Sequence, residues 1–149
     1  MNVSLAITDN LKNAAPVNRN LVIAAALLHD ITKTKSLKTK EHHDASGGAL
    51  LRELGFQKTA EIVEQHVVIQ NLNLTGRLEE REIVFYADKR VLHDTIVTLE
   101  ERMDDLMRRY GTGEEIRRQI LQNKIQALAI ERKIAGFMAV DLNHAIRKI

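Results

Sequence analysis

Eight consecutive apolar residues, Leu21 to Leu28, constrain the fold of this chain more than any other part of its sequence. On a helix such a run leaves no face for solvent, so it predicts a helix buried at the centre of the molecule. The alanines at positions 24 to 26 allow neighbouring helices to approach closely. The run is too short to cross a bilayer, which takes about 20 residues, so we expect no membrane association.

The rest of the sequence is also typical of helices. It has one Pro and 3% aromatic residues, whereas Ala, Leu, Ile, Glu, Lys and Arg dominate. With 149 residues, 44% of them hydrophobic, the chain is long enough for one core and too short for two comfortable domains. We therefore expect an all-α, single-domain helical bundle of about six helices. Its core covers about residues 3–110, and a C-terminal helical extension covers about 112–148.

Apolar periodicity, caps and glycines predict where these helices lie. The Lys-rich segment Ile31–Glu41 interrupts the periodicity and predicts a loop, and Asn71–Arg77 predicts a turn. A capping box of Thr112 and Glu115 predicts the start of the last helical region. Besides the buried run, the other helices are expected at Val3–Lys12, His43–Gly55 and Thr59–Gln70, and as one long or kinked helix at Glu80–Tyr110.

Cysteine content and charge exclude several classes of function. The absence of Cys excludes disulfide scaffolds, thiolate metal sites and thiol catalysis. It is compatible with a reducing compartment, and the N-terminus lacks the pattern of a secretory signal, so we expect a cytoplasmic protein. The net charge is only +2, from 22 basic and 20 acidic residues, which is unlike a dedicated nucleic-acid binder. These patterns leave the oligomeric state open.

The doublet His29–Asp30 closes the apolar run and is the first candidate for chemistry. An Asp at this point lies at the negative end of the helix dipole with little water around it, so its charge is unfavourably placed. A bound cation would offset both penalties, and imidazole with carboxylate is a ligand pair that suits first-row metals. A simple C-terminal cap with a solvated Asp is the alternative.

Asp88 and His66 also fall on apolar helix faces. Asp88 lies within the arc centred on Ile83, Ala87 and Val91, where an ionised carboxylate needs a partner. That partner is either a metal or an arginine, such as Arg52 or Arg90. Taken alone, His66 is a core histidine satisfied by a carbonyl group. Taken together with the doublet, these inward polar residues favour one shared site.

A further pair, His42 and His43, begins the helix that contains Gly47, one turn beyond His43. Periodicity does not decide which of the two imidazoles faces inward. Between the doublet and this pair lie four lysines at positions 33, 35, 38 and 40. They form either an ordinary solvated loop or a rim that collects phosphate.

In this order and spacing the motifs resemble the HD-domain superfamily of metal-dependent phosphohydrolases. The stretch from Ala24 to Lys33, AAALLHDITK, is similar to the signature helix end of that superfamily. The stretch His43 to Gly55, HDASGGALLRELG, is similar to the second His motif, and Ala60 to His66 is similar to the third. Tyr86 to Arg90, YADKR, is similar to the closing Asp motif. The resemblance covers about the first 110 residues.

The resemblance implies a ligand set of His29, Asp30, His43, His66 and Asp88 around one or two divalent ions. His29, Asp30 and Asp88 would hold one ion, and Asp30 would bridge to a second ion held by His43 and His66. The mixed imidazole and carboxylate ligands do not distinguish iron, manganese, magnesium, nickel, cobalt and zinc.

Lys33 matches the phosphate-contacting lysine of the superfamily, so Asp30 and Lys33 are the residues expected to act in catalysis. Lys89 and Arg90 adjoin Asp88 and are candidates for contact with the substrate phosphate. Salt bridges from these two cations to glutamates are an equal alternative.

The implied activity is metal-dependent hydrolysis of a phosphomonoester or phosphodiester of a nucleotide or small phosphorylated metabolite. Superfamily members with this layout carry a further His on the first helix, and no His precedes His29; the equivalent place falls just before Met1. An excised domain, a misassigned start and a lost ligand are the three explanations. The last makes the chain a catalytically impaired nucleotide-binding or regulatory module, which is the alternative function.

Other polar residues are weaker candidates. The doublet His93–Asp94 lacks an upstream apolar segment, so we do not expect it to bind metal. His144, near the C-terminus, has a solvated surface position by default. Arg108 and Arg109 look like solvated helix faces that acidic neighbours largely neutralise.

Overall fold

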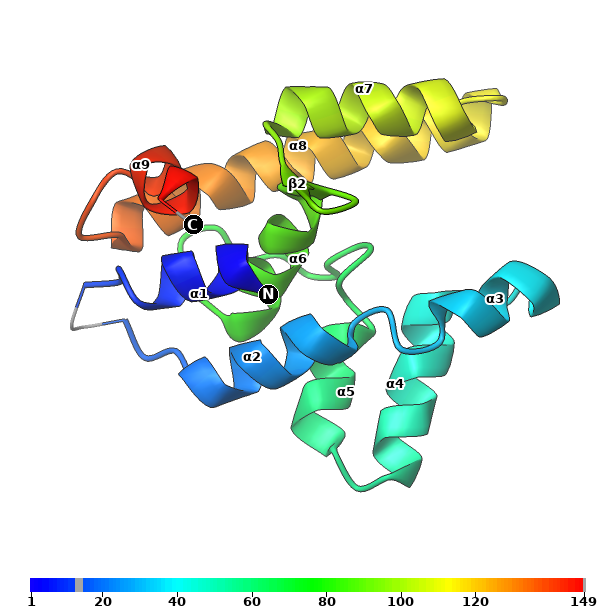
Figure 1. Cartoon of the computed structure of the whole chain (residues 1–149), viewed down its shortest axis with the longest axis horizontal. Coiled ribbons are helices and arrows are strands. Elements are labelled where there is room, and N and C mark those ends of the chain that lie inside the picture. Colours follow the sequence, from blue (N-terminus) through cyan, green and yellow to red (C-terminus); the bar gives the residue numbers. More distant parts are fainter. Residues whose placement is uncertain (13–14, 149) are drawn as a thin grey trace.

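A computed structural model describes residues 1–12 and 15–148 of the chain. Over these residues the chain forms nine helices and one short hairpin (Figure 1). They are α1 (Asn2–Thr8), α2 (Arg19–Leu28), α3 (Lys33–Thr39), α4 (His43–Glu53), α5 (Gln57–Val63), α6 (Glu80–Lys89), β1 (Val91–Leu92), β2 (Thr95–Ile96), α7 (Leu99–Tyr110), α8 (Glu114–Phe137) and α9 (Leu142–Arg147). The all-α expectation is confirmed, with more and shorter helices than the six expected.

Helix α6, rather than α2, is the centre of the core. Ile83, Phe85 and Tyr86 are fully buried, and α6 packs against α1, α2, α5 and α8. In α2 the side chain of Asn18 accepts a hydrogen bond from the backbone of Leu21, as an N-cap does. The helix then buries one side only, because Leu27 is 60% exposed. The prediction that the apolar run has no solvent face was therefore wrong.

The Lys-rich segment is helical where a loop was expected. Helix α3 begins at Lys33 and ends at Thr39, and the left-handed backbone of the C-cap residue Lys40 (φ 64°) stops it. Within α3 only Ser36 is buried, so the helix has no apolar stripe by which periodicity could have revealed it. The hydroxyl of Thr32 donates to the carbonyl of His43 at 2.8 Å and ties the start of α3 to the start of α4.

The expected helix over 80–110 is divided in two by the β1–β2 hairpin. Val91 pairs with Ile96, and His93 adopts a left-handed backbone (φ 57°) in the turn between the strands. Thr98 then caps α7, since its hydroxyl accepts from the backbone of Glu101 and the Glu101 side chain returns to Thr98. The capping box therefore lies here and not at Thr112, which precedes the N-cap of α8.

The C-terminal helices share the core of the N-terminal ones. Ile130 and Ile134 of α8 and Ile146 of α9 are fully buried in the same cluster as α6. The buried ammonium of Lys133 lies 2.7 Å from the carboxylate of Glu82, which links α8 to α6. Figure 1 shows α7 and α8 side by side above α6, with α2 to α5 below. Among the described helices, none is both long and apolar enough to span a membrane.

Candidate metal centre

The ends of four segments distant in sequence meet at one place. Asp30 follows the C-cap of α2, and His43 is the first residue of α4. His66 lies just beyond α5, and Asp88 is the next-to-last residue of α6. Functional side chains at helix ends are held by rigid elements on either side, so the arrangement is set by the packing of α2, α4, α5 and α6.

Asp30, His43 and His66 form the tightest part of this group. One ligand atom from each lies within 4.8 Å of the others. Oδ1 of Asp30 is 3.3 Å from Nε2 of His43 and 3.7 Å from Nε2 of His66. The two Nε2 atoms are 3.0 Å apart. His43, and not His42, is therefore the inward residue of the histidine pair.

Backbone carbonyl groups fix which ring nitrogen faces the site. Nδ1 of the buried His66 lies 2.6 Å from the carbonyl of Val63, and Nδ1 of His29 lies 2.9 Å from the carbonyl of Ala26. A carbonyl only accepts, so each Nδ1 carries the proton and, in the neutral ring, the lone pair is on Nε2. The same arrangement orients metal-ligating histidines in proteins.

Asp88 and His29 complete the group. Nε2 of His29 is 3.4 Å from Oδ1 of Asp88 and 3.6 Å from Oδ2 of Asp30. The arginine partners considered for Asp88 are engaged elsewhere, since Arg52 pairs with Glu64, and Arg90 donates to the carbonyl of Val97. The two carboxylates are thus linked through one imidazole rather than neutralised by arginine.

Electrostatics keeps both carboxylates ionised. Burial alone raises the pKa of Asp30, but His43, His66 and Lys33 outweigh burial and hold that pKa well below its usual range. Burial likewise raises the pKa of Asp88, and the charge of Lys89 with the contact from His29 lowers it further than burial raises it.

His29 shows the matching shift. Burial lowers the pKa of its imidazole, but the hydrogen bond and charge of Asp88 outweigh burial, so the net pKa is raised.

These residues fit a divalent metal ion. Oδ1 of Asp30 is buried and accepts no hydrogen bond from the described residues, although two imidazole nitrogens face it. Such a convergence of acceptor atoms is costly unless a cation lies among them. Imidazole and carboxylate together suit iron, manganese, cobalt, nickel and zinc, and do not distinguish them.

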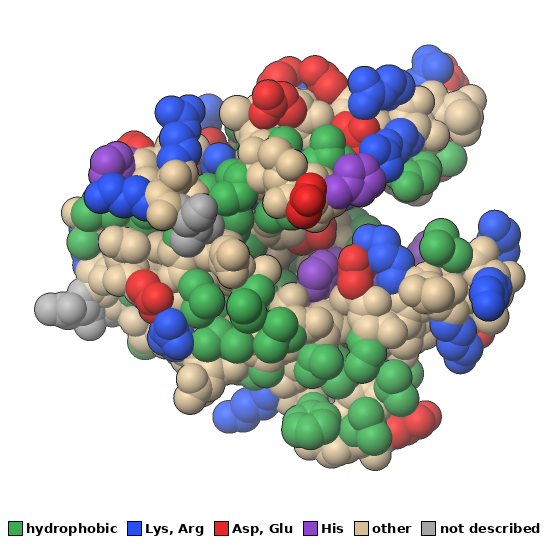
Figure 2. All heavy atoms as spheres, viewed as in Figure 1, with side chains coloured by type: hydrophobic (Ala, Val, Ile, Leu, Met, Phe, Trp, Pro, Cys, Tyr) green, Lys and Arg blue, Asp and Glu red, His purple; other side chains and the backbone are tan. Residues whose placement is uncertain are grey.

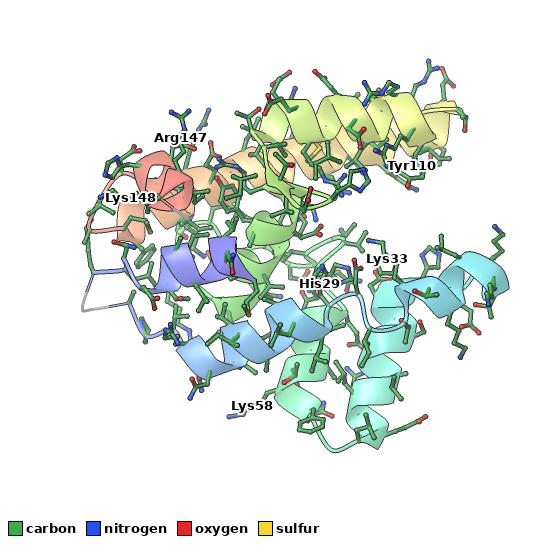
Figure 3. The ribbon with its side chains drawn as sticks, in the orientation of Figure 1. His29, Lys33, Lys58, Tyr110, Arg147 and Lys148 are labelled. Carbon is green, nitrogen blue, oxygen red and sulfur yellow. The ribbon has the colours of Figure 1, made fainter. Side chains whose placement is uncertain are left out.

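A cavity of about 460 Å³ opens beside these residues. His29, Asp30, Lys33 and Asp88 line one wall, and Nζ of Lys33 lies 2.6 Å from Oδ2 of Asp30. Figure 2 shows the hollow, with histidine and basic side chains on both lips. Figure 3 shows His29 and Lys33 on one side and Tyr110 of α7 on the other. A site of this size is within the range for small-molecule ligands.

The family model described as HD domain matches residues 1–92, which is more than half of the chain and includes all five expected ligands. The chain belongs to the HD domain family. A curated relative is the tRNA (cytidine(56)-2'-O)-methyltransferase of Picrophilus torridus, 32% identical over 111 residues, which are 66% of this chain and 32% of that protein. The chain thus spans about a third of the length of this relative. No solved structure matches.

Lys89 and Arg90, which were expected to contact the substrate phosphate, do not line the cavity. Lys89 is buried, and its ammonium donates to the carbonyl of His66 at 2.8 Å and lies 3.4 Å from Asp88. Arg90 is buried too and donates from Nε to the carbonyl of Val97 at 2.7 Å. The structure therefore gives both cations internal contacts, and the glutamate alternative holds for Arg90, which lies 3.6 Å from Glu131.

The first helix of the HD domain supplies no imidazole. Within α1 the residues that line the cavity are Ser4 and, at its N-cap, Met1. Burial lowers the pKa of the Met1 amino group, and the nearby Asp88 carboxylate partly offsets this. Met1 therefore lies at the cavity, near Asp88.

Sequence reasoning missed the wall of the cavity opposite the metal ligands. His93, Arg102, Arg109 and Tyr110 line this wall, and all lie beyond the segment that matches the HD domain model or at its edge. The available signal was the spacing of arginines three and four residues from Asp105, which is 2% exposed. It was obscured because the hairpin that turns α7 toward the cavity was not predicted.

Proposed function

We propose that this HD domain hydrolyses a phosphate ester of a nucleotide or small phosphorylated metabolite with one or two bound divalent ions. The observation that carries the proposal is the convergence of Asp30, His43 and His66 beside a ligand-sized cavity that Asp30 lines. His29 and Asp88 extend the ligand set. The family membership supports the same chemistry.

Such hydrolysis needs side chains that hold the phosphate group and the metal ions in place, and Lys33 and Asp30 are positioned for these tasks. Lys33 is half exposed at the cavity and is held by Asp30, so its ammonium is placed to bind the phosphate oxygens and stabilise the charge that develops on them. Asp30 stays ionised because its pKa is lowered. Divalent ions held by these ligands would supply Lewis acidity and a water that ionises near neutral pH.

A nucleotide is favoured over smaller phosphate esters by the opposite wall. Tyr110 lines the cavity and is 56% exposed, and an exposed aromatic side chain is a surface on which a base can stack. The cavity volume of about 460 Å³ is sufficient for a nucleotide.

A binding module without turnover is the second candidate function. It is favoured by the ligand count, since α1 presents Met1 and Ser4 to the cavity and no imidazole. Methyl transfer to tRNA, the reaction in the name of the relative, is not proposed for this chain, because the chain spans only a third of that protein.

Metal reconstitution separates the two candidates. The purified chain is stripped with a chelator, reloaded singly with manganese, iron, cobalt, nickel, zinc or magnesium, and assayed for phosphate release from nucleotides and model phosphoesters. Turnover that follows the bound metal supports hydrolysis. Stoichiometric metal with no turnover on any substrate supports the binding module. Failure to retain any divalent ion would reject both.

A further inference from the structure

Helix α7 has four acidic and three basic residues, but its three arginines gather around one buried carboxylate. Asp105 is 2% exposed and is surrounded by three arginines of the same helix. Arg108 and Arg109 lie 2.8 and 2.9 Å from its Oδ1, and Arg102 lies 3.6 Å from its Oδ2. Two positive charges therefore remain without a negative partner in this cluster.

The arginines of this cluster differ in what they face. Arg102 and Arg109 line the cavity of the metal centre, whereas Arg108 does not line it and has a side chain that is 76% exposed. Nε of Arg102 is buried and has no hydrogen-bond acceptor among the described residues. An unpaired buried guanidinium donor is costly. Oδ2 of Asp105, 3.6 Å from the same guanidinium, also lacks a hydrogen-bond partner in the described part of the chain.

The β1–β2 hairpin holds Arg109 at the cavity. His93 lies in the turn with a left-handed backbone (φ 57°), and its Nε2 is 2.9 Å from Nη2 of Arg109. Because guanidinium nitrogens only donate, this ring nitrogen accepts and is unprotonated. Arg109 also pairs with Asp105, and the contact with His93 further restricts the position of its side chain.

The cavity therefore has two walls of different chemistry. The wall of Asp30 and Asp88 presents acceptors for cations, and Lys33 stands beside it for one phosphate. The wall of Arg102 and Arg109 presents donors and positive charge that the metal centre does not use. Guanidinium groups bind phosphate oxygens through paired hydrogen bonds, and this geometry makes arginine the preferred residue for that task.

We propose that Arg102 and Arg109 bind a second phosphate group of the substrate, while the group to be hydrolysed lies at the metal centre. The substrate class is then a small molecule with at least two phosphates, either adjacent or on separate positions of a nucleoside. This inference rests on the proposed function for the identity of the first phosphate, and its test uses binding, so that the two can fail separately.

The test compares adenosine probes that differ in the second phosphate. Calorimetry on the manganese-loaded chain measures dissociation constants for adenosine 5′-monophosphate, the methylene-bridged analogue of adenosine 5′-diphosphate, and adenosine 3′,5′-bisphosphate, with product formation followed in the same samples. We expect one of the two-phosphate probes to bind at least about tenfold more tightly than the monophosphate. The two arms distinguish adjacent from separate phosphates.

Variants then test whether the wall of Arg102 and Arg109 causes the preference for a second phosphate. Arg102→Ala and Arg109→Ala remove the preference for the second phosphate and leave monophosphate binding within about twofold. Arg108→Ala, on the same helix and the same carboxylate, keeps the preference. Arg109 is 41% exposed, so its variant carries the test if Arg102→Ala does not fold.

The possible outcomes are distinct. Absence of hydrolysis with an arginine-dependent preference rejects the proposed function and supports the second phosphate site. Equal affinity for all three probes, or a preference that survives both cavity variants, overturns the inference. An equal loss in Arg108→Ala also overturns it, because the effect would then come from the overall charge of α7 rather than from contact.

Discussion

Each of the two walls of the cavity has a buried polar atom without a hydrogen-bond partner in the described part of the chain, but one atom is an acceptor and the other is a donor. On the wall formed by α2 and α6, Oδ1 of Asp30 is buried and accepts no hydrogen bond from the described residues. On the wall formed by α7, Nε of Arg102 is buried and has no acceptor there. A cation would complete the first wall, and an anion would complete the second. One cavity thus presents complementary requirements, as expected for a site that binds metal and phosphate together.

A third buried charge pair shows that these unmatched atoms are not a general property of the fold. The ammonium of Lys133 lies 2.7 Å from a carboxylate oxygen of Glu82 and 2.7 Å from the carbonyl of Asn73. This pair links α8 to α6 and is almost fully buried, and neither residue lines the cavity. The Lys133–Glu82 pair is satisfied within the core, whereas the unpaired Oδ1 of Asp30 and Nε of Arg102 belong to residues that line the cavity.

The largest expected effect comes from removing Asp30 from the wall that contains the candidate metal ligands. Asp30→Ala removes the carboxylate that contacts His43 and His66, so we expect metal loading and hydrolysis to be lost together, with metal affinity reduced by more than about a hundredfold. Helix content by circular dichroism stays near wild type, because Asp30 lies outside α2. The control, His144→Ala, changes neither quantity. Activity retained within a few fold would reject Asp30 as a shared ligand.

The next effect separates phosphate binding from metal binding on the same wall. Lys33→Ala removes an ammonium that is half exposed at the cavity, so we expect hydrolysis to fall by about 10²-fold. Metal content by elemental analysis is unchanged, since Lys33 is no ligand. Loss of metal in this variant would mean that Lys33 acts by holding Asp30 in place.

Proton competition gives a smaller, graded effect. Asp88 raises the pKa of His29 above its usual value, and a protonated imidazole cannot bind metal. We therefore expect metal affinity to fall by about tenfold per pH unit as the pH drops through this raised pKa. In the metal-free chain the sign is reversed, because the stabilisation from protonated His29 is present at low pH and is lost as the pH rises. Competition titrations from about pH 8 to about pH 6 measure the first effect; a flat profile would contradict it.

The smallest effect concerns the arginine that faces away from both walls. Arg108→Ala removes a guanidinium that is 76% exposed, and Asp105 keeps Arg109 at 2.9 Å. We expect the melting temperature to change by no more than about 2 °C, with metal affinity unaltered. A larger loss, measured by thermal denaturation, would show that α7 depends on the complete arginine cluster.

The two walls also differ in how far the sequence predicts them. Asp30, His43, His66 and Asp88 each lie at or near the end of a helix, on an apolar face or beside an apolar run, so local pattern makes them candidates, although it did not decide between His42 and His43. Their convergence was an expectation from the order of the motifs, and the distances are consistent with it. The assignment of these residues as metal ligands stays a prediction.

The arginine wall depends on a chain reversal that local pattern did not indicate. The apolar and charged residues from 80 to 110 fit one continuous helix, and the hairpin is stabilised by contacts that involve Arg90 and Val97 across it. The role of Leu21–Leu28 was overestimated for a related reason: composition shows that a segment is apolar, but tertiary packing decides how much of it is covered.

The hairpin between Asp88 and α7 has a consequence for how this site can change. It is the short connection between Asp88, which lies within the segment matched by the HD domain model, and the helix that carries Arg102 and Arg109. A residue inserted or deleted in that turn would rotate α7 relative to the metal centre and reset the spacing between the two phosphate positions. Substrate preference can therefore diversify through the length of one turn, while the candidate metal ligands stay unchanged.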